Sequence, residues 1–257
     1  MGNSFSINPF ELLRNITQAS TPQIVSAPTF VGLLSIENFL EDARPLLRPL
    51  LKFSQDPLIK GILLHINCNG GSFGTTQAVI NEILKIKKTK PIIVIIENIC
   101  HSCAYYLAAA SDFIFALPCS ELGSIGVIRT LRHHKDLKFN ENNVSGKLET
   151  TVITAGDYKY PGVYVSLDEE RKLSMQKNSQ RIYQHIVTDI AQMRNLSVED
   201  EKTWANGREF VGIEALELGL IDDLGGYTDA LEKMKELLAE RGIQIYGNLE
   251  ISEAYFV

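Results

Sequence analysis

The sequence predicts an α/β protein in which parallel strands alternate with helices. Two nearly continuous apolar runs, IKGILLHI at 59–66 and PIIVII at 91–96, are typical of strands that are buried on both faces. Thr75–Lys88, between them, has a helical period and a basic end that suits a helix C-terminus. Strands and helices that alternate in this way over about 70 residues imply βαβ units with right-handed crossovers.

The other elements follow from the same patterns, taken in chain order. Ile24–Ile36 alternates apolar and polar residues and should contain a strand, and Glu37–Phe53 carries leucines at helical spacing. Ser102–Ala110 is small and apolar, as expected of a short buried helix. Arg132–Glu149 is polar and is expected to be irregular. Further strands are predicted at Phe113–Ala116 and Ile125–Ile128, and further helices at Leu167–Met193, Ser197–Ala205 and Ile213–Leu218.

One domain with two flanking segments is expected. The 257 residues can bury a substantial core without a disulfide or a metal ion. Residues 1–26 are polar and are predicted to form an N-terminal arm, residues 27–241 the main domain, and residues 242–257 a C-terminal tail. The net charge is −6 and no basic stretch alternates with aromatic residues, so nucleic acid is not expected as a partner.

Cysteine usage and the N-terminal segment bear on the compartment. Four irregularly spaced cysteines do not form a disulfide framework and favour a reducing compartment. The first residues lack the pattern of a secretory signal, and no apolar run is long enough to span a bilayer. A cytoplasmic protein is therefore expected. Gly2 with Ser6 fits a weak myristoylation pattern, so peripheral contact of the arm with a membrane stays open.

Two predicted strand ends carry residues suited to chemistry, and in open α/β folds sites lie at the carboxyl ends of strands. Gly70 and Gly71 follow the first buried strand, where the absence of a Cβ lets backbone N–H groups approach an oxygen. Ser102 follows the second, at the start of a buried helix whose dipole favours negative charge. Taken alone, these features are more simply explained as a tight turn and a helix N-cap.

Together, the two segments resemble the signal peptide peptidase A family of serine proteases. The similar blocks are HINCNGGSFG, ICHSCAYYLAAASDFIFALP, ELGSIGVI, TAGDYK at 154–159 and NGREFVGIEALELGLIDDLGG at 206–226, in the same order as in the family. The resemblance covers roughly residues 30–235. It implies a Clp-protease/crotonase type of fold, built from repeated ββα and βαβ units, and the hydrolysis of peptide bonds through an acyl-enzyme.

The resemblance also assigns roles to single residues. Ser102 falls on the nucleophile, and Lys159, three residues after a glycine, falls on the general base. A serine hydroxyl needs such a base, and a lysine can act as one only when its amine is neutral. The family's oxyanion hole falls on Gly70, Gly71 and the backbone N–H of Cys103.

Ser124, in the GSIG block, corresponds to a residue near the family's active site, so it is expected to support the dyad. The resemblance further implies a peptide substrate and a homo-oligomer in the form of a ring or a dome. In some members, the serine and lysine of one site come from neighbouring subunits. No metal or cofactor is expected. Cys103 and Ala104 stand where the family usually has glycines, and we expect their side chains to narrow the cleft.

Other interpretations remain open on the sequence. A crotonase-like acyl-CoA enzyme would use the same oxyanion turn for enolate chemistry without Ser102 and Lys159, and a catalytically silent scaffold would keep only the fold and the oligomer. Cys100-x-x-Cys103 permits a thioredoxin-like or zinc-binding interpretation, although no second cysteine pair has zinc spacing. Solvated or core positions are the simpler explanation for His65, His133, His134 and Trp204.

Overall fold

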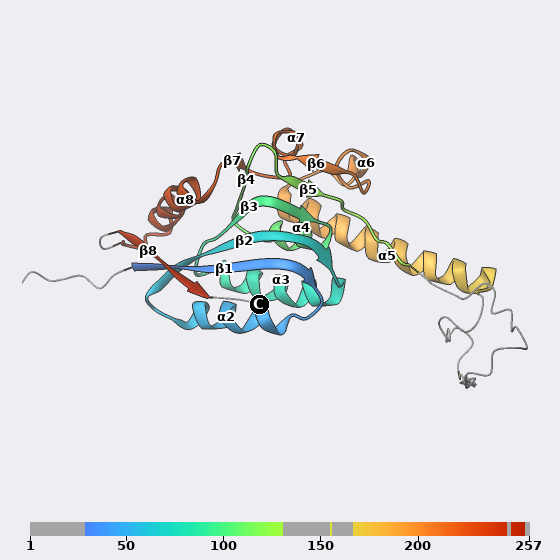
Figure 1. The fold of residues 1–257 in the computed structure, drawn as a ribbon, viewed down its shortest axis with the longest axis horizontal. Coiled ribbons are helices and arrows are strands. Elements are labelled where there is room, and N and C mark those ends of the chain that lie inside the picture. The colour runs from blue at the N-terminus through green and yellow to red at the C-terminus, as the bar shows by residue number, and fades with distance from the viewer. Residues whose placement is uncertain (1–28, 131–154, 156–166, 246–247, 255–257) are drawn as a thin grey trace, which may run out of the picture.

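A mostly parallel β-sheet forms the centre of the protein (Figure 1). The computed structural model describes residues 29–130, 155, 167–245 and 248–254. Six strands lie in the order β6-β5-β3-β2-β1-β8, while β4 pairs with β3 and β7 pairs with β4. The strands are β1 (Thr29–Leu40), β2 (Ile59–Gly71), β3 (Ile92–His101), β4 (Phe113–Ala116), β5 (Glu121–Gly123), β6 (Glu209–Val211), β7 (Asp223–Leu224) and β8 (Leu249–Ala254).

Helices cover both faces of this sheet. Figure 1 shows α2 and α3 on one side of the central strands and α8 on the other. The helices are α2 (Arg44–Gln55), α3 (Phe73–Ile86), α4 (Cys103–Ala108), α5 (Glu169–Arg194), α6 (Glu201–Trp204), α7 (Gly212–Glu217) and α8 (Tyr227–Glu240). The predicted alternation of strands and helices is therefore confirmed, as is the α/β class.

The sheet separates two apolar cores, which explains the continuous apolar runs. In β2, Ile62 and Leu64 pack into the larger core with α2, α3 and α4, whereas Leu63 packs into the smaller core with Met234 and Leu238 of α8. Successive side chains of a strand point to opposite faces, so a strand covered on both faces needs an apolar residue at every position.

Two boundaries predicted near the first strands were wrong. The helix expected over Glu37–Phe53 begins only at Arg44, because β1 continues to Leu40. The residues expected to form a turn at 67–71 are the last residues of β2, which stay paired with β1 as far as Leu40 and Gly71. The local sequence at 67–71 favours a turn, but backbone pairing between β1 and β2 keeps both strands extended to their ends.

Two further predictions also need correction. Ile125–Ile128 is not a strand; the strand in this region is β5, which ends at Gly123 because Ser124 has a positive φ of 49° and donates its N–H to the carbonyl of Arg208 at 2.7 Å. Within the helix predicted at Ser197–Ala205, only α6 is helical. Leu249–Ala254, inside the expected C-terminal tail, forms β8 and pairs in parallel with β1.

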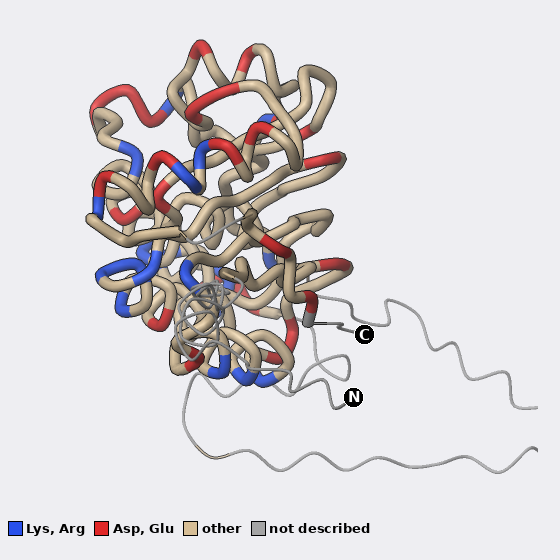
Figure 2. The backbone as a smooth tube through the Cα atoms, turned by 90° about the vertical axis from the view of Figure 1, so that its left-hand side faces the viewer, with Lys and Arg blue, Asp and Glu red and all other residues tan. Residues whose placement is uncertain are grey.

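The predicted long helix is confirmed as α5. Asp168 caps its start by accepting a hydrogen bond from the backbone N–H of Arg171, and Asn195 ends it in a left-handed conformation. Its N-terminal half extends away from the sheet (Figure 1). None of the helices in the described ranges combines the length and the apolarity that a bilayer crossing requires. Acidic and basic residues are interspersed along most of the described backbone (Figure 2).

Candidate active site

Ser102 sits in a strained turn between β3 and α4. Its φ of 53° and ψ of −119° are rare for a residue with a side chain. The turn is fixed from both sides: the N–H of Ser102 donates to the carbonyl of Gly123 at 2.7 Å, and its carbonyl accepts from Tyr106 at 3.0 Å. Ser102 occupies the N-cap position of α4, but its hydroxyl makes no capping bond. The simple N-cap interpretation is therefore wrong.

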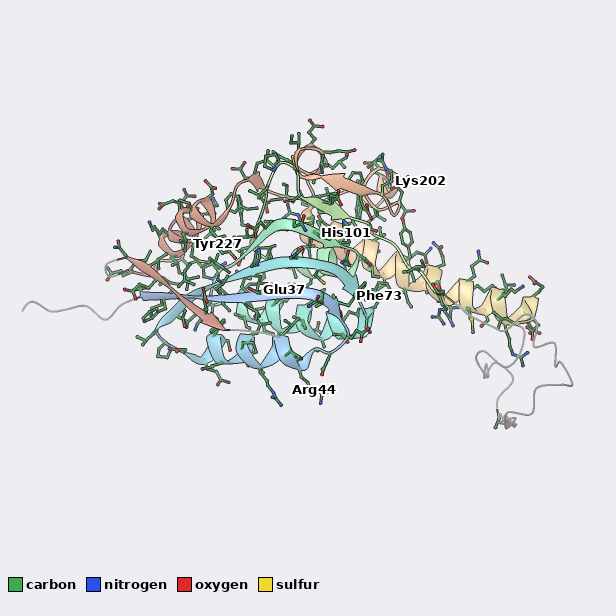
Figure 3. The ribbon with its side chains drawn as sticks, viewed as in Figure 1. Glu37, Arg44, Phe73, His101, Lys202 and Tyr227 are labelled. Carbon is green, nitrogen blue, oxygen red and sulfur yellow. The ribbon has the colours of Figure 1, made fainter. Side chains whose placement is uncertain are left out.

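An open cleft of about 570 Å³ lies over this turn. Ser102, Ser124 and Gly71 all line it, so three of the predicted site residues share one cavity. Its other lining residues include four large apolar side chains, namely Phe39, Phe73, Val127 and Ile128. Figure 3 shows Phe73 and His101 at the same end of the sheet, where β2 and β3 finish.

The apolar lining was not anticipated from the sequence. Phe39 is 61% exposed and Ile128 is 90% exposed, although both are large hydrophobic residues. Phe39 lies within the predicted helix Glu37–Phe53 and Ile128 within the predicted strand Ile125–Ile128, and neither pattern indicates a cleft. The signal that could have found them is a bulky apolar residue near the carboxyl end of a strand, where parallel strands of α/β folds present their sites. Phe39 is the second-last residue of β1, and Ile128 follows β5.

Both glycines of the Gly-Gly pair are required by close packing. A Cβ at position 71 would lie 2.4 Å from the carbonyl oxygen of Leu40, and a Cβ at position 70 would lie 3.0 Å from Cβ of Ser102. Gly70 also has a φ of 114°, which disfavours any side chain. The N–H of Gly70 donates to Sγ of Cys68 at 3.4 Å, a weak acceptor that a stronger one could displace.

Cys103 and Ala104 do not narrow the cleft. Both residues are fully buried in the larger core, and neither lines the cavity over Ser102. The expectation that their side chains would restrict substrate size is therefore wrong. The physical reason is that α4 turns into the core immediately after Ser102, so only the serine faces outward.

The three cysteines around this turn are free thiols and are buried. Burial raises the pKa of Cys68 and of Cys103, and raises that of Cys100 strongly. A redox pair requires an accessible thiolate, so the thioredoxin-like interpretation of Cys100 and Cys103 is not supported. Their packing is that of small apolar core residues.

Two tyrosines hold α4 in place beneath the cleft. The hydroxyl of Tyr105 donates to the carbonyl of Leu220 at 2.7 Å, and that of Tyr106 bonds the carboxylate of Asp189 on α5. Burial raises the pKa of both phenols, so both remain neutral donors. The first turn of α4 is thereby tied to α5 and to the loop before β7.

Lys159 lies outside the described residues. The remaining histidine and tryptophan predictions agree with structural roles: Nε2 of His65 lies 3.1 Å from a carboxylate oxygen of Glu97, and Trp204 is buried and donates to the carbonyl of Ser197. His133 and His134 also fall outside the described part of the chain.

Comparison with known proteins is consistent across sequence and structure. The family model described as peptidase family S49 matches residues 85–241. A protein of Methanocaldococcus jannaschii assigned as a protease is 32% identical over 198 residues, which are 77% of this chain and 62% of that protein. A protein of Enterococcus faecium assigned as a signal peptide peptidase is 30% identical over 230 residues, covering 87% of this chain and 63% of that one.

A solved structure supports the fold. A mutant of a membrane-bound stomatin-specific protease superimposes with a TM-score of 0.59 at 15% sequence identity, over 90% of this chain and 100% of that one. The Clp-protease/crotonase type of fold expected from the sequence is thus confirmed. The chain spans about three fifths of the length of the two curated relatives.

The packing of Gly71 makes a stability prediction. Gly71→Ala should lower the free energy of unfolding by about 2 kcal/mol or more, because the new methyl group would overlap the backbone of Leu40. Gly74→Ala is the matched control: nothing lies within 4 Å of a Cβ there, and alanine favours the helix by up to about 1 kcal/mol. Denaturant unfolding of both variants tests this, and equal midpoints would contradict it.

The backbone strain at Ser102 leads to a second prediction about stability. Ser102→Gly should be more stable than Ser102→Ala by about 1 kcal/mol, because glycine relieves the positive φ while alanine keeps it. Both variants lack the hydroxyl, so their comparison isolates the backbone. An alanine variant as stable as the glycine variant in thermal unfolding would mean that the turn carries no strain.

Proposed function

The chain belongs to peptidase family S49, and we propose that it is a serine peptidase with Ser102 as nucleophile and Lys159 as general base. The observation that carries the proposal is the strained turn that presents Ser102 in an open cleft. Strain of this kind costs about 1–3 kcal/mol and persists where the surroundings impose it, which is common at catalytic residues. Strand-to-helix turns expose nucleophiles in other hydrolases for the same geometric reason.

The proposed reaction proceeds through an acyl-enzyme. The neutral amine of Lys159 takes the proton of the Ser102 hydroxyl, and the serine oxygen attacks the carbonyl carbon of the peptide bond. The protonated amine then gives its proton to the leaving nitrogen, and the C–N bond breaks. Water hydrolyses the resulting ester by the same steps, which restores the serine hydroxyl and the neutral lysine.

Backbone N–H groups would stabilise the tetrahedral intermediate. We assign this oxyanion hole to the backbone N–H groups of Gly70, Gly71 and Cys103. The two glycines have no Cβ, so a substrate oxygen can approach their backbone closely. In comparable enzymes, one such donor contributes about 2.7–4 kcal/mol of transition-state stabilisation. Ser124 lines the same cleft and is assigned to orienting the dyad.

An extended peptide is the proposed substrate. The cleft is open and of the size of ordinary ligand sites, and Phe39, Phe73 and Ile128 offer apolar surface to side chains on either side of the cleaved bond. Internal cleavage of short peptides, including remnants of signal peptides, fits such an open groove. We therefore propose endopeptidase activity with a preference for apolar residues.

A homo-oligomer in the form of a ring or a dome is proposed as the active form. The projecting half of α5 and the 50% exposure of Leu173 on that helix offer a surface for a neighbouring copy. Such an assembly restricts access to the sites and allows a neighbouring subunit to supply Lys159. We also propose a cytoplasmic location, with contact between residues 1–26 and a membrane surface as an accessory feature.

The acyl-CoA and silent-scaffold alternatives make different use of Ser102. An enolate-forming enzyme needs the oxyanion donors but no nucleophile, and a scaffold needs neither. In neither case would the function require a serine at position 102. A glycine would adopt the positive φ at a lower cost in conformational free energy. The strained serine therefore favours the peptidase over both.

Covalent labelling tests the nucleophile. A fluorophosphonate probe should modify the wild-type chain at Ser102, and Ser102→Ala should abolish both labelling and peptide cleavage. Ser72→Ala is the matched control, since Ser72 is exposed beside Gly71 and its side chain does not cap α3. Mass mapping of the modified peptide locates the label; its presence on another residue, or its absence from folded wild-type protein, would reject this assignment.

The pH profile tests the base. Peptidase activity of the wild type should rise with pH as the amine of Lys159 loses its proton, since only the neutral form accepts the serine proton. Lys159→Met should lower kcat/KM by about 10²–10⁴-fold, whereas the exposed-lysine control Lys202→Met should leave it unchanged. Full turnover in Lys159→Met with the pH dependence retained would exclude this lysine as the base.

A further inference from the structure

His101 is a buried histidine that the proposed peptidase mechanism does not use. It is the last residue of β3 and directly precedes Ser102. Its side chain is only 10% exposed, and its Nε2 is buried with no hydrogen-bond partner in the described part of the chain. Its Nδ1 faces a carboxylate oxygen of Glu209 at 3.9 Å, which is too long for a hydrogen bond. A buried imidazole in this state requires an explanation.

Strand pairing brings two carboxylates to the same place. In the parallel pair of β3 and β5, His101 lies opposite Gly123, and in the antiparallel pair of β5 and β6, Gly123 lies opposite Glu209. Glu121 is two residues before Gly123 on the same strand, and side chains two apart share a face. One ligand atom from each of His101, Glu121 and Glu209 lies within 4.8 Å of the others.

The opposite face of these strands is apolar core. Cys100, Leu122 and Phe210, which alternate with the three polar residues, are all buried there. The thiol of Cys100 therefore points away from His101, and a mixed cysteine and histidine zinc site does not form at this position. Within the described ranges, neither Glu121 nor Glu209 pairs with a lysine or an arginine, so nothing there neutralises the two carboxylates by direct contact.

We propose that His101, Glu121 and Glu209 bind a divalent transition-metal ion, with zinc as the reference ion. The imidazole nitrogen that faces Glu209 is Nδ1, and it is the ligand nitrogen in this proposal. One imidazole nitrogen and two carboxylate oxygens are ligands that zinc and neighbouring metals accept, and water would fill the remaining position. Ligands about 2.0–2.2 Å from a tetrahedral zinc ion lie roughly 3.3–3.6 Å apart. The ligand atoms of the three residues now lie within 4.8 Å of one another. Small rotations of the two exposed glutamate side chains would bring these atoms to the spacing that zinc requires.

The ion would act on structure rather than as a step in peptide cleavage. It would join β3, β5 and β6 at the level of the nucleophile, where Gly123 accepts the hydrogen bond from the N–H of Ser102. These strands are short, since β5 and β6 have three residues each, and β6 lies at the edge of the sheet, so an ion that joins them to β3 would add to the few contacts that hold the turn of Ser102. The inference goes beyond the proposed function and stands whether or not Lys159 is the base.

Titration of the metal-free full chain with zinc by calorimetry, in a buffer that does not chelate it, tests the site. We expect one ion per chain, and at least a tenfold weaker affinity in Glu121→Gln and in Glu209→Gln. Glu240→Gln, the same change at an exposed position of α8, is the matched control and should bind like the wild type. Equal affinity in all four proteins would overturn the proposal.

The spectrum of bound cobalt distinguishes this site from the cysteines. Substitution of Co²⁺ should give absorption bands of nitrogen and oxygen ligation, without the near-ultraviolet charge-transfer band of a thiolate. A thiolate band in the wild type would overturn the proposal by assigning the ion to cysteine. This measurement needs no variant, so the test for thiolate ligation stands even if the glutamine variants fail to fold. Circular dichroism of the metal-free proteins would reveal such a failure.

Discussion

The turn at Ser102 is the constraint on which the rest of the site depends. A residue with a side chain is held at positive φ because its N–H is fixed by Gly123 of β5 and its carbonyl by the first turn of α4. Neither bond alone would hold the conformation, since strain of this kind relaxes unless the surroundings over-determine it. The nearby glycine is part of the same constraint: at position 70, a methyl group would meet Cβ of Ser102 at 3.0 Å.

The branching of the sheet at β3 creates the room for this turn. The first half of β3 pairs with β4 and its last three residues pair with β5, so the chain changes partner just before the serine. Beyond that point β5 breaks off at Ser124, whose own positive φ turns the following residues over the cleft. Ser102 and Ser124, two serines at positive φ next to neighbouring strand ends, therefore line the same cavity.

Burial around the turn separates reactive groups from inert ones. Three thiols lie within the core, where desolvation raises their pKa and keeps them protonated, whereas Ser102 lines the cleft. The same separation applies across β3: Cys100 points into the core and His101 to the outer face. Alternation along one strand thus places an inert thiol and an unsatisfied imidazole one residue apart.

The sequence by itself determined the alternating strands and helices and the presence of Ser102 at a strand end. Continuous apolar runs at β2 and β3 have few explanations other than strands buried on both faces, because period and length are local properties. What the sequence could not provide was the pairing between distant segments. The extension of β1 to Leu40, the strand β8 within the expected tail, and the burial of Cys103 all depend on contacts made only in the folded chain. The strain at Ser102 and the meeting of His101 with Glu121 and Glu209 have the same origin, since register between strands, and not any local pattern, brings those atoms together.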